Sequence, residues 1–151
     1  MPSSDGTYWT TDEELFLTLQ GSAEVAEWFG CPPSFHDAEI ERLELATGSG
    51  TIVLRAFRTT NEVDAKGFFI LDRLALVTVH LDGVTAISLR GDASSIVQEI
   101  GIRRVLAEQS GWETVAGPRI GNIELTWESS FGLEGSLYAR EVSFSLDPMT
   151  M

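Results

Sequence analysis

The chain has 151 residues, 43% hydrophobic and 22% charged, values typical of one globular domain with a real core. It carries 23 acidic and 10 basic side chains, so its formal net charge is −13. This charge disfavours nucleic acid and anionic membranes as partners, because their phosphates would repel the protein. Its single cysteine, Cys31, excludes an internal disulfide. With no signal-peptide pattern and no apolar run long enough to span a bilayer, the expected location is the cytoplasm.

Two short helices are expected at the beginning of the chain. Thr11 and Glu14 match a capping box for the first helix, with apolar residues following them. Ser22 can cap the second helix, which ends before the Pro32-Pro33 pair. Both helices are rich in glutamate, whereas this part of the chain is nearly free of basic residues. The sequence therefore predicts an acidic helical segment over residues 1–33.

From residue 38 onward the hydrophobic period changes to two, which is typical of β-strands. The segments predicted as strands are 39–46, 51–57, 68–81, 84–89, 122–128 and 135–146. Turns are expected at Gly48-Ser49-Gly50 and at Asp82-Gly83, and the polar stretch 59–67 is expected to be a loop. The strand at 122–128 alternates apolar with polar residues, which favours one buried and one wet face.

One further helix is expected within the sheet, over residues 92–107. Asp92 can cap it, and the spacing of Ile96, Val97 and Ile100 fits a helix, although Gly101 weakens its middle by roughly 1 kcal/mol relative to alanine. The predicted fold class is α+β, a single domain over residues 1–151. It has a mainly antiparallel sheet of about six to seven strands over residues 38–146 and two to three short helices.

The stretch SFHDAEI, residues 34–40, is the one dense cluster of reactive side chains. In a structural interpretation Phe35 enters the core and His36 holds the backbone by a hydrogen bond, while Asp37 and Glu39 face water. In a chemical interpretation His36 and the two acids form the centre of a small metal-dependent or acid–base enzyme. Both interpretations stay open at the level of sequence.

A metal site would need ligands from more than this stretch. In an extended strand His36 and Asp37 point to opposite faces, so they do not easily chelate one ion. His36 together with His80 and Asp82 would make a His-His-carboxylate set. The chain lacks the phosphate-binding, metalloprotease and nucleophile-elbow motifs, so no catalytic residue, resident metal or cofactor is predicted.

The string PSFHDAEI, which follows a helix ending in WFGCPP, resembles the opening strand of a bacterial family, immunity protein 50. The later string FGLEGSLYAR, residues 131–140, is similar to the glycine-punctuated hairpin near the end of such proteins. The resemblance implies a non-enzymatic cytoplasmic antidote that binds and blocks a toxin domain of a polymorphic toxin system.

The partner expected from this resemblance is a cognate protein toxin. Many toxin domains are nucleases with basic clefts, which an acidic protein can occupy electrostatically. The predicted partner-binding residues are His36, Asp37, Glu39, Glu13, Glu14, Glu24 and Glu27. A structural or self-associating module, a homo-oligomer, is the further alternative, and a long exposed strand edge would mark it.

Overall fold

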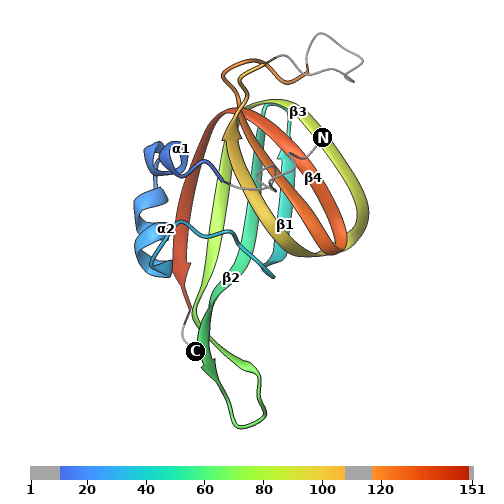
Figure 1. Ribbon diagram of the computed structural model, residues 1–151. Helices are drawn as coiled ribbons and strands as arrows, with labels where there is room; N and C mark the ends of the chain where they lie inside the picture. Colours follow the sequence, from blue (N-terminus) through green and yellow to red (C-terminus); the bar gives the residue numbers. More distant parts are fainter. Residues whose placement is uncertain (1–10, 108–116, 150–151) are drawn as a thin grey trace.

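The computed structural model describes residues 11–107 and 117–149, apart from the side chains of residues 94, 95, 130 and 131. These residues form mainly antiparallel sheet with two short helices (Figure 1). The elements are α1 Glu13–Thr18, α2 Ser22–Phe29, β1 Glu39–Ala46, β2 Ser49–Val63, β3 Phe69–Arg104 and β4 Ile123–Pro148. The predicted antiparallel sheet is confirmed, but strands outweigh helices so far that the fold is mainly β rather than clearly α+β.

The sheet has the order β1-β2-β3-β4, and every neighbouring pair is antiparallel. β3 and β4 form one long ribbon, which runs from the pair Ala75↔Pro148 to the pair Arg104↔Ile123. The ribbon folds over, so that its far half reaches β1 through the pair Glu39↔Ile96 (Figure 1). The curled sheet therefore encloses a core between two halves of its own ribbon.

Glycines permit the bends in β3. Gly83 and Gly91 have φ values of 69° and 117°, a region that side chains with a Cβ rarely adopt. The β3–β4 register shifts next to both glycines, as expected for bulges. The predicted turn at Asp82-Gly83 is therefore wrong, because the strand continues through it. All six segments predicted as strands lie within the four strands, except for their first residues Phe68 and Asn122.

The helix predicted over residues 92–107 is also wrong, because β3 continues to Arg104. Val97 and Ile100 are both buried, and a spacing of three is what a helix would show. In the structure the register shifts between Val97 and Glu99, so an extra residue in the strand produces the same spacing. From Ile100 to Ile102 the ordinary alternation of a strand returns, with both side chains buried.

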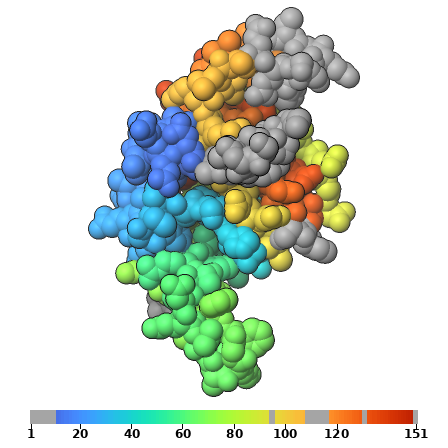
Figure 2. Space-filling view, viewed as in Figure 1, coloured from blue at the N-terminus to red at the C-terminus, as the bar shows by residue number. Residues whose placement is uncertain are grey.

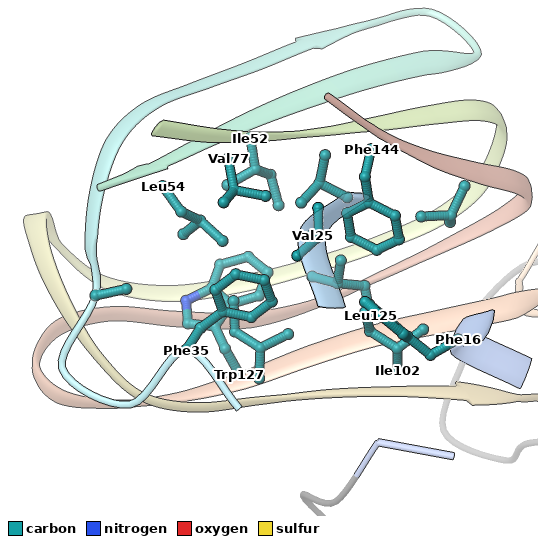
Figure 3. Packing of buried hydrophobic residues seen from close by; sticks show 14 of the residues in the cluster. Phe16, Val25, Phe35, Ile52, Leu54, Val77, Ile102, Leu125, Trp127 and Phe144 are labelled. Carbon is teal, nitrogen blue, oxygen red and sulfur yellow. The ribbon is translucent and has the colours of Figure 1, made fainter. Parts of the chain in front are cut away.

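The core contains side chains from both helices and from β2, β3 and β4, and Ile40 and Leu43 of β1 pack against it. Trp127 is its largest fully buried side chain, and the indole Nε1 donates a hydrogen bond to the Leu133 carbonyl at 2.9 Å. Figure 3 shows Phe35 and Trp127 close together, with Val25 of α2 facing Phe144 of β4. The two helices thus complete the core on one side of the curled sheet.

The first part of β4 departs from the predicted alternation of buried and wet residues. Asn122, Glu124 and Thr126 are buried, as are their apolar neighbours. Their polar atoms have partners: the Asn122 Oδ1 accepts from the Thr85 hydroxyl at 2.6 Å, and the Thr126 Oγ1 lies 2.8 Å from the Ser136 Oγ. The predicted wet face is therefore wrong, since hydrogen bonds to neighbouring strands let these polar residues be buried.

The helices differ from the prediction in their caps. Asp12, not Thr11, caps α1 with its Oδ1, which accepts a hydrogen bond from the Leu15 amide at 3.2 Å. The Thr11 hydroxyl instead donates to the Ile100 carbonyl at 3.2 Å. Ser22 is buried inside the first turn of α2, and Gly21 takes the cap position without a side-chain hydrogen bond. Neither described helix has the length and apolar character needed to span a membrane.

The β2–β3 hairpin projects from the body of the molecule, and we call residues 58–73 the arm (Figures 1 and 2). β2 pairs with β1 only as far as Arg55, and β4 pairs with β3 only from Ala75 onward. Beyond these points the described residues of the two strands pair with each other, apart from the Leu74 carbonyl, which accepts a hydrogen bond from the Met149 amide at 2.8 Å. Part of the stretch predicted as a loop, 59–67, is therefore strand, since β2 continues to Val63.

Candidate functional site

The stretch SFHDAEI connects α2 to β1 and hydrogen-bonds to the far half of β3. The Asp37 amide donates to the Val97 carbonyl, and the Val97 amide donates to the Ala38 carbonyl, both at 2.8 Å. The Ile100 amide donates to the Ser34 carbonyl at 2.9 Å. These bonds join the two halves of the curled sheet along the edge where β1 meets β3. The backbone of this stretch is therefore part of the sheet closure.

The side chains of this stretch follow the structural interpretation. Phe35 is buried, whereas Asp37 and Glu39 are exposed. The His36 Nδ1 lies 2.6 Å from the Gln98 carbonyl, a distance that requires a proton on Nδ1. Phe35 and Asp37 both have φ near 60°, a costly conformation for residues with a Cβ, and these hydrogen bonds hold them in it.

The geometry gives little support to chemistry at His36. Its Nε2 lies 3.8 Å from the Asp37 carboxylate, and both side chains are more than half exposed. A small cavity of about 100 Å³ beside them is lined by Ser34, Pro32, Pro33 and neighbours, but not by His36, Asp37 or Glu39. A general acid–base pair would need a water-excluding site next to it.

The His-His-carboxylate set considered from the sequence is not assembled. The His80 Nε2 lies 2.8 Å from the Ser145 hydroxyl, whereas His36 contacts the Gln98 carbonyl of the far half of β3. Within residues 11–107 and 117–149, no three or more His, Cys, Asp or Glu side chains come together in a way that could hold a metal ion. The exposed Cys31 belongs to no such group either.

The four helix glutamates are brought together by the α1–α2 pair. Glu13 and Glu14 lie in the first turn of α1, Glu24 lies in the first turn of α2, and Glu27 lies one turn later. All four side chains are exposed, and none forms an ion pair with a described residue. First-turn carboxylates are favoured by the positive end of the helix dipole. The two helices therefore present negative charge that no described basic group neutralises.

Two acids of β1 have basic partners, whereas Glu39 of the same strand has none among the described residues. The Glu41 carboxylate lies 2.6 Å from the Arg55 guanidinium, and Glu44 lies 3.6 Å from Arg42. The helical glutamates therefore differ from Glu41 and Glu44, which each lie near an arginine. We call Glu13, Glu14, Glu24 and Glu27 the acidic helix face. All four side chains are exposed on the two helices.

The base of the arm is fastened to α2. The Trp28 Nε1 donates to the Arg73 carbonyl at 2.8 Å, and the Arg73 guanidinium lies 4.9 Å from the centroid of the Trp28 ring. Arg58 donates two hydrogen bonds to the Asp72 carboxylate, at 2.9 Å and 2.6 Å. These hydrogen bonds lower the pKa of Asp72, aided by the positive charges of Arg58 and Arg73. The arm therefore has a defined direction relative to α2.

The outer part of the arm exposes apolar side chains. Phe68 is 68% exposed and Phe69 is 61% exposed, and Val63, Ile70 and Leu71 are also exposed. The sequence pattern does not predict this surface, because residues 59–67 are expected to form a loop and not half of a hairpin. The signal that could have found it is the run Phe68-Phe69-Ile70-Leu71 directly after a turn containing Gly67.

Basic residues gather at the opposite end of β2 from the arm. A groove of about 660 Å³ is lined by His80, Arg104 and Arg140 among others, and an adjoining groove of about 610 Å³ is lined by Arg119 and Arg140. Asp82 lines both grooves, and Glu141 lines the first. The mixed charge of these open grooves favours no single class of ligand.

Comparisons of the chain with protein-family models, curated proteins and solved structures give no significant match.

Proposed function

We propose that this protein is a non-enzymatic binding module, an immunity protein that neutralises a cognate bacterial toxin by covering it with the acidic helix face. The observation that carries the proposal is the exposure of four glutamates on two adjacent helices without a neutralising ion pair among the described residues. The resemblance of PSFHDAEI to the immunity protein 50 family supplies the kind of partner. A basic cleft on the toxin domain would complement this face.

The proposed mechanism is steric and electrostatic. Opposite charges attract the partner over about 8 Å at physiological salt, which raises the rate of encounter. Once docked, the helices exclude the toxin's substrate from the cleft. Asp37 and Glu39, exposed on the segment after α2, are proposed to add charge at the border of this face. His36 is proposed to contribute its exposed ring edge while its Nδ1 remains bonded to Gln98.

The test is capture of a partner from a lysate of the source organism, identified by mass spectrometry. The baits are the natural chain and the variants E13K/E14K, E24K/E27K and D92K/E128K. The last pair lies in the β3–β4 half of the sheet and changes the net charge by the same +4, from −13 to −9. The expected result is one stoichiometric partner, a toxin domain, that the first two variants lose and D92K/E128K retains. Capture of that partner equally by all four baits would overturn the proposed face.

A protection assay separates binding from neutralisation. Cells that express the captured domain alone are expected to stop growing, and co-expression of this protein should restore growth. E24K/E27K should fail to protect at equal expression, whereas D92K/E128K should protect. A captured domain that is harmless to cells would contradict the immunity role while leaving the binding face in place.

A further inference from the structure

The outer part of the arm exposes five large apolar side chains. They are Val63, Phe68, Phe69, Ile70 and Leu71. Figure 2 shows the arm standing free of the rest of the chain, so no described residue covers its tip. Because successive side chains of a strand point to opposite faces, Phe69 and Leu71 share one face of the arm, and exposed apolar side chains gathered in this way often mark interaction surfaces.

The charge of the arm differs from that of the body. Residues 58–73 contain three bases, Arg58, Lys66 and Arg73, and three acids, Glu62, Asp64 and Asp72. The remaining seven bases and twenty acids carry the whole net charge of −13. Two copies of the chain would repel each other through their bodies but not through their arms. The arm is thus the part of the surface where a like-charged second copy can approach at the least electrostatic cost.

Only one edge of the arm is regular enough to pair with another strand. Along β2 the register shifts between Thr59 and Val63, and the Thr60 hydroxyl donates to the Ile70 carbonyl at 2.7 Å in place of a backbone amide. Bulged edges of this kind resist pairing. Along β3 the segment Phe69–Asp72 lies beyond the reach of β4, whose pairing begins at Ala75. Among the described residues, the β3 edge at Phe69–Leu71 is therefore the one without a neighbouring strand.

The direction of the peptide groups in β3 determines the register in which two β3 edges could pair. The carbonyls of Phe68 and Ile70 accept hydrogen bonds from Asp64 and Thr60, so both point toward β2. Because peptide groups alternate along a strand, those of Phe69 and Leu71 point to the open edge. In an antiparallel pair of two identical edges, Phe69 of one copy then exchanges both hydrogen bonds with Leu71 of the other. Ile70 lies on the two-fold axis.

We infer that this protein forms a two-fold dimer through the β3 edges of two arms, centred on Ile70. Each copy places Phe69 against Leu71 of the other, so the pairing buries the apolar side chains that are exposed in one chain. Antiparallel pairing directs the two acidic bodies to opposite ends of the joined arms. The pairing segment Phe69–Leu71 carries no proline, lysine or extra residue of β3, and the β3 bulge at Arg73 lies outside it. The inference goes beyond the proposed function and does not depend on it.

Sedimentation velocity over a concentration series tests the dimer. The natural chain should sediment as a species of twice 16.5 kDa at high concentration. F69E should raise the dimer dissociation constant at least about tenfold, because it removes an apolar contact on both sides of the axis. L106E adds the same charge at an exposed leucine outside the arm and should leave the constant unchanged. A natural chain that stays at 16.5 kDa up to about 1 mM would overturn the dimer.

Two further variants test the register. F69E/L71K places opposite charges across each pair in the inferred register and should recover most of the dimer that F69E loses. In a C31S background, I70C should form an intermolecular disulfide on mild oxidation, since directly opposed Cα atoms in such a pair lie about 4.5 Å apart. L17C, at an exposed position on α1, is the matched control and should form no intermolecular disulfide, although its arms still pair. Cross-linking of both variants, or of neither, would contradict the register.

The dimer and the toxin-binding face can be tested independently of each other. F69E should be monomeric and still capture the toxin domain, whereas E24K/E27K should be dimeric and fail to capture it. If F69E folds normally but no longer captures the toxin domain, the apolar arm contacts the heterologous partner and not a second copy.

Discussion

The backbone carbonyl of Phe144 occupies the position that a Cβ atom on Gly21 would need. The contact arises because the Phe144 amide donates to the Gln20 carbonyl at 2.8 Å, which holds the α1–α2 connection against the outer edge of β4. Gly21 also has φ of 82°, where only glycine is at ease. The junction that positions the acidic helix face therefore depends on one glycine.

We predict that Gly21→Ala lowers the free energy of unfolding by at least about 3 kcal/mol, since it combines an unfavourable φ with a clash against backbone. Gly48→Ala is the matched control, because Gly48 has φ of 80° but no atom near its missing Cβ. It should cost about 1–2 kcal/mol. Urea denaturation of both variants measures the difference, and equal losses would show that the Phe144 contact relaxes freely.

His36→Ala should lower the free energy of unfolding by about 0.5–1 kcal/mol, because it removes the hydrogen bond to the Gln98 carbonyl. His36→Asn can place an amide N–H near the position of Nδ1 and should recover most of this loss, whereas His36→Gln should not. Denaturation curves of the three variants test this order. Equal stabilities would indicate that the His36–Gln98 contact contributes nothing in solution.

Ser22→Ala should stabilise the protein by about 1 kcal/mol. The Ser22 hydroxyl is buried without a hydrogen-bond partner among the described residues, and burial of an unpaired polar group is unfavourable. Ser88→Ala, at an exposed strand position, should change stability little and serves as the control. A loss of stability in Ser22→Ala would mean that the hydroxyl has a partner in solution, such as a bound water.

The Arg58–Asp72 pair makes the base of the arm sensitive to acid. The hydrogen bonds from Arg58 lower the pKa of Asp72 below its ordinary value of 3.8 in the folded chain. The stabilisation is therefore present above pH 3.8 and is lost as the pH falls through the lowered value. Because the pair is partly exposed, we expect local loosening of the arm and not global unfolding.

Amide hydrogen exchange at residues 58–73, followed from pH 5 down to about 2.5, would detect this loosening. Asp72→Asn should show faster exchange at pH 5 and little further change with acid. If protection of the arm amides from exchange depends on pH as strongly in Asp72→Asn as in the natural chain, the Arg58–Asp72 pair does not have this role.

The secondary structure predicted from the sequence is correct where the local pattern is compatible with only one type of element. The alternation along Ile123, Leu125 and Trp127 is characteristic of a strand, and both N-terminal helices lie where polar residues and prolines bound them. The prediction was wrong where a β-bulge in β3 produced the sequence pattern of a turn or of a helix. Gly83 allows a bend in β3 with the same positive φ that a hairpin turn would use, and the bulge at Val97 reproduces helical spacing.

The candidate site was predictable only in part. The exposure of Glu13 and Glu24 follows from helix periodicity, and the burial of Phe35 follows from its size and apolar character. The bond between His36 and the Gln98 carbonyl spans 62 residues, so it depends on the folding-over of the β3–β4 ribbon. The same holds for Trp28 and Arg73, 45 residues apart. Local sequence contains no signal for contacts that only the tertiary fold creates.

The measurement that most directly tests the central claim is the affinity of the captured partner for matched charge variants, determined by calorimetry at low and high salt. We predict that E24K/E27K binds at least about tenfold more weakly than the natural chain at low salt, and that salt reduces this difference. D92K/E128K, with the same net charge, should bind nearly as well as the natural chain. Equal weakening by both variants, or an affinity of the natural chain that does not change with salt, would contradict binding through the acidic helix face.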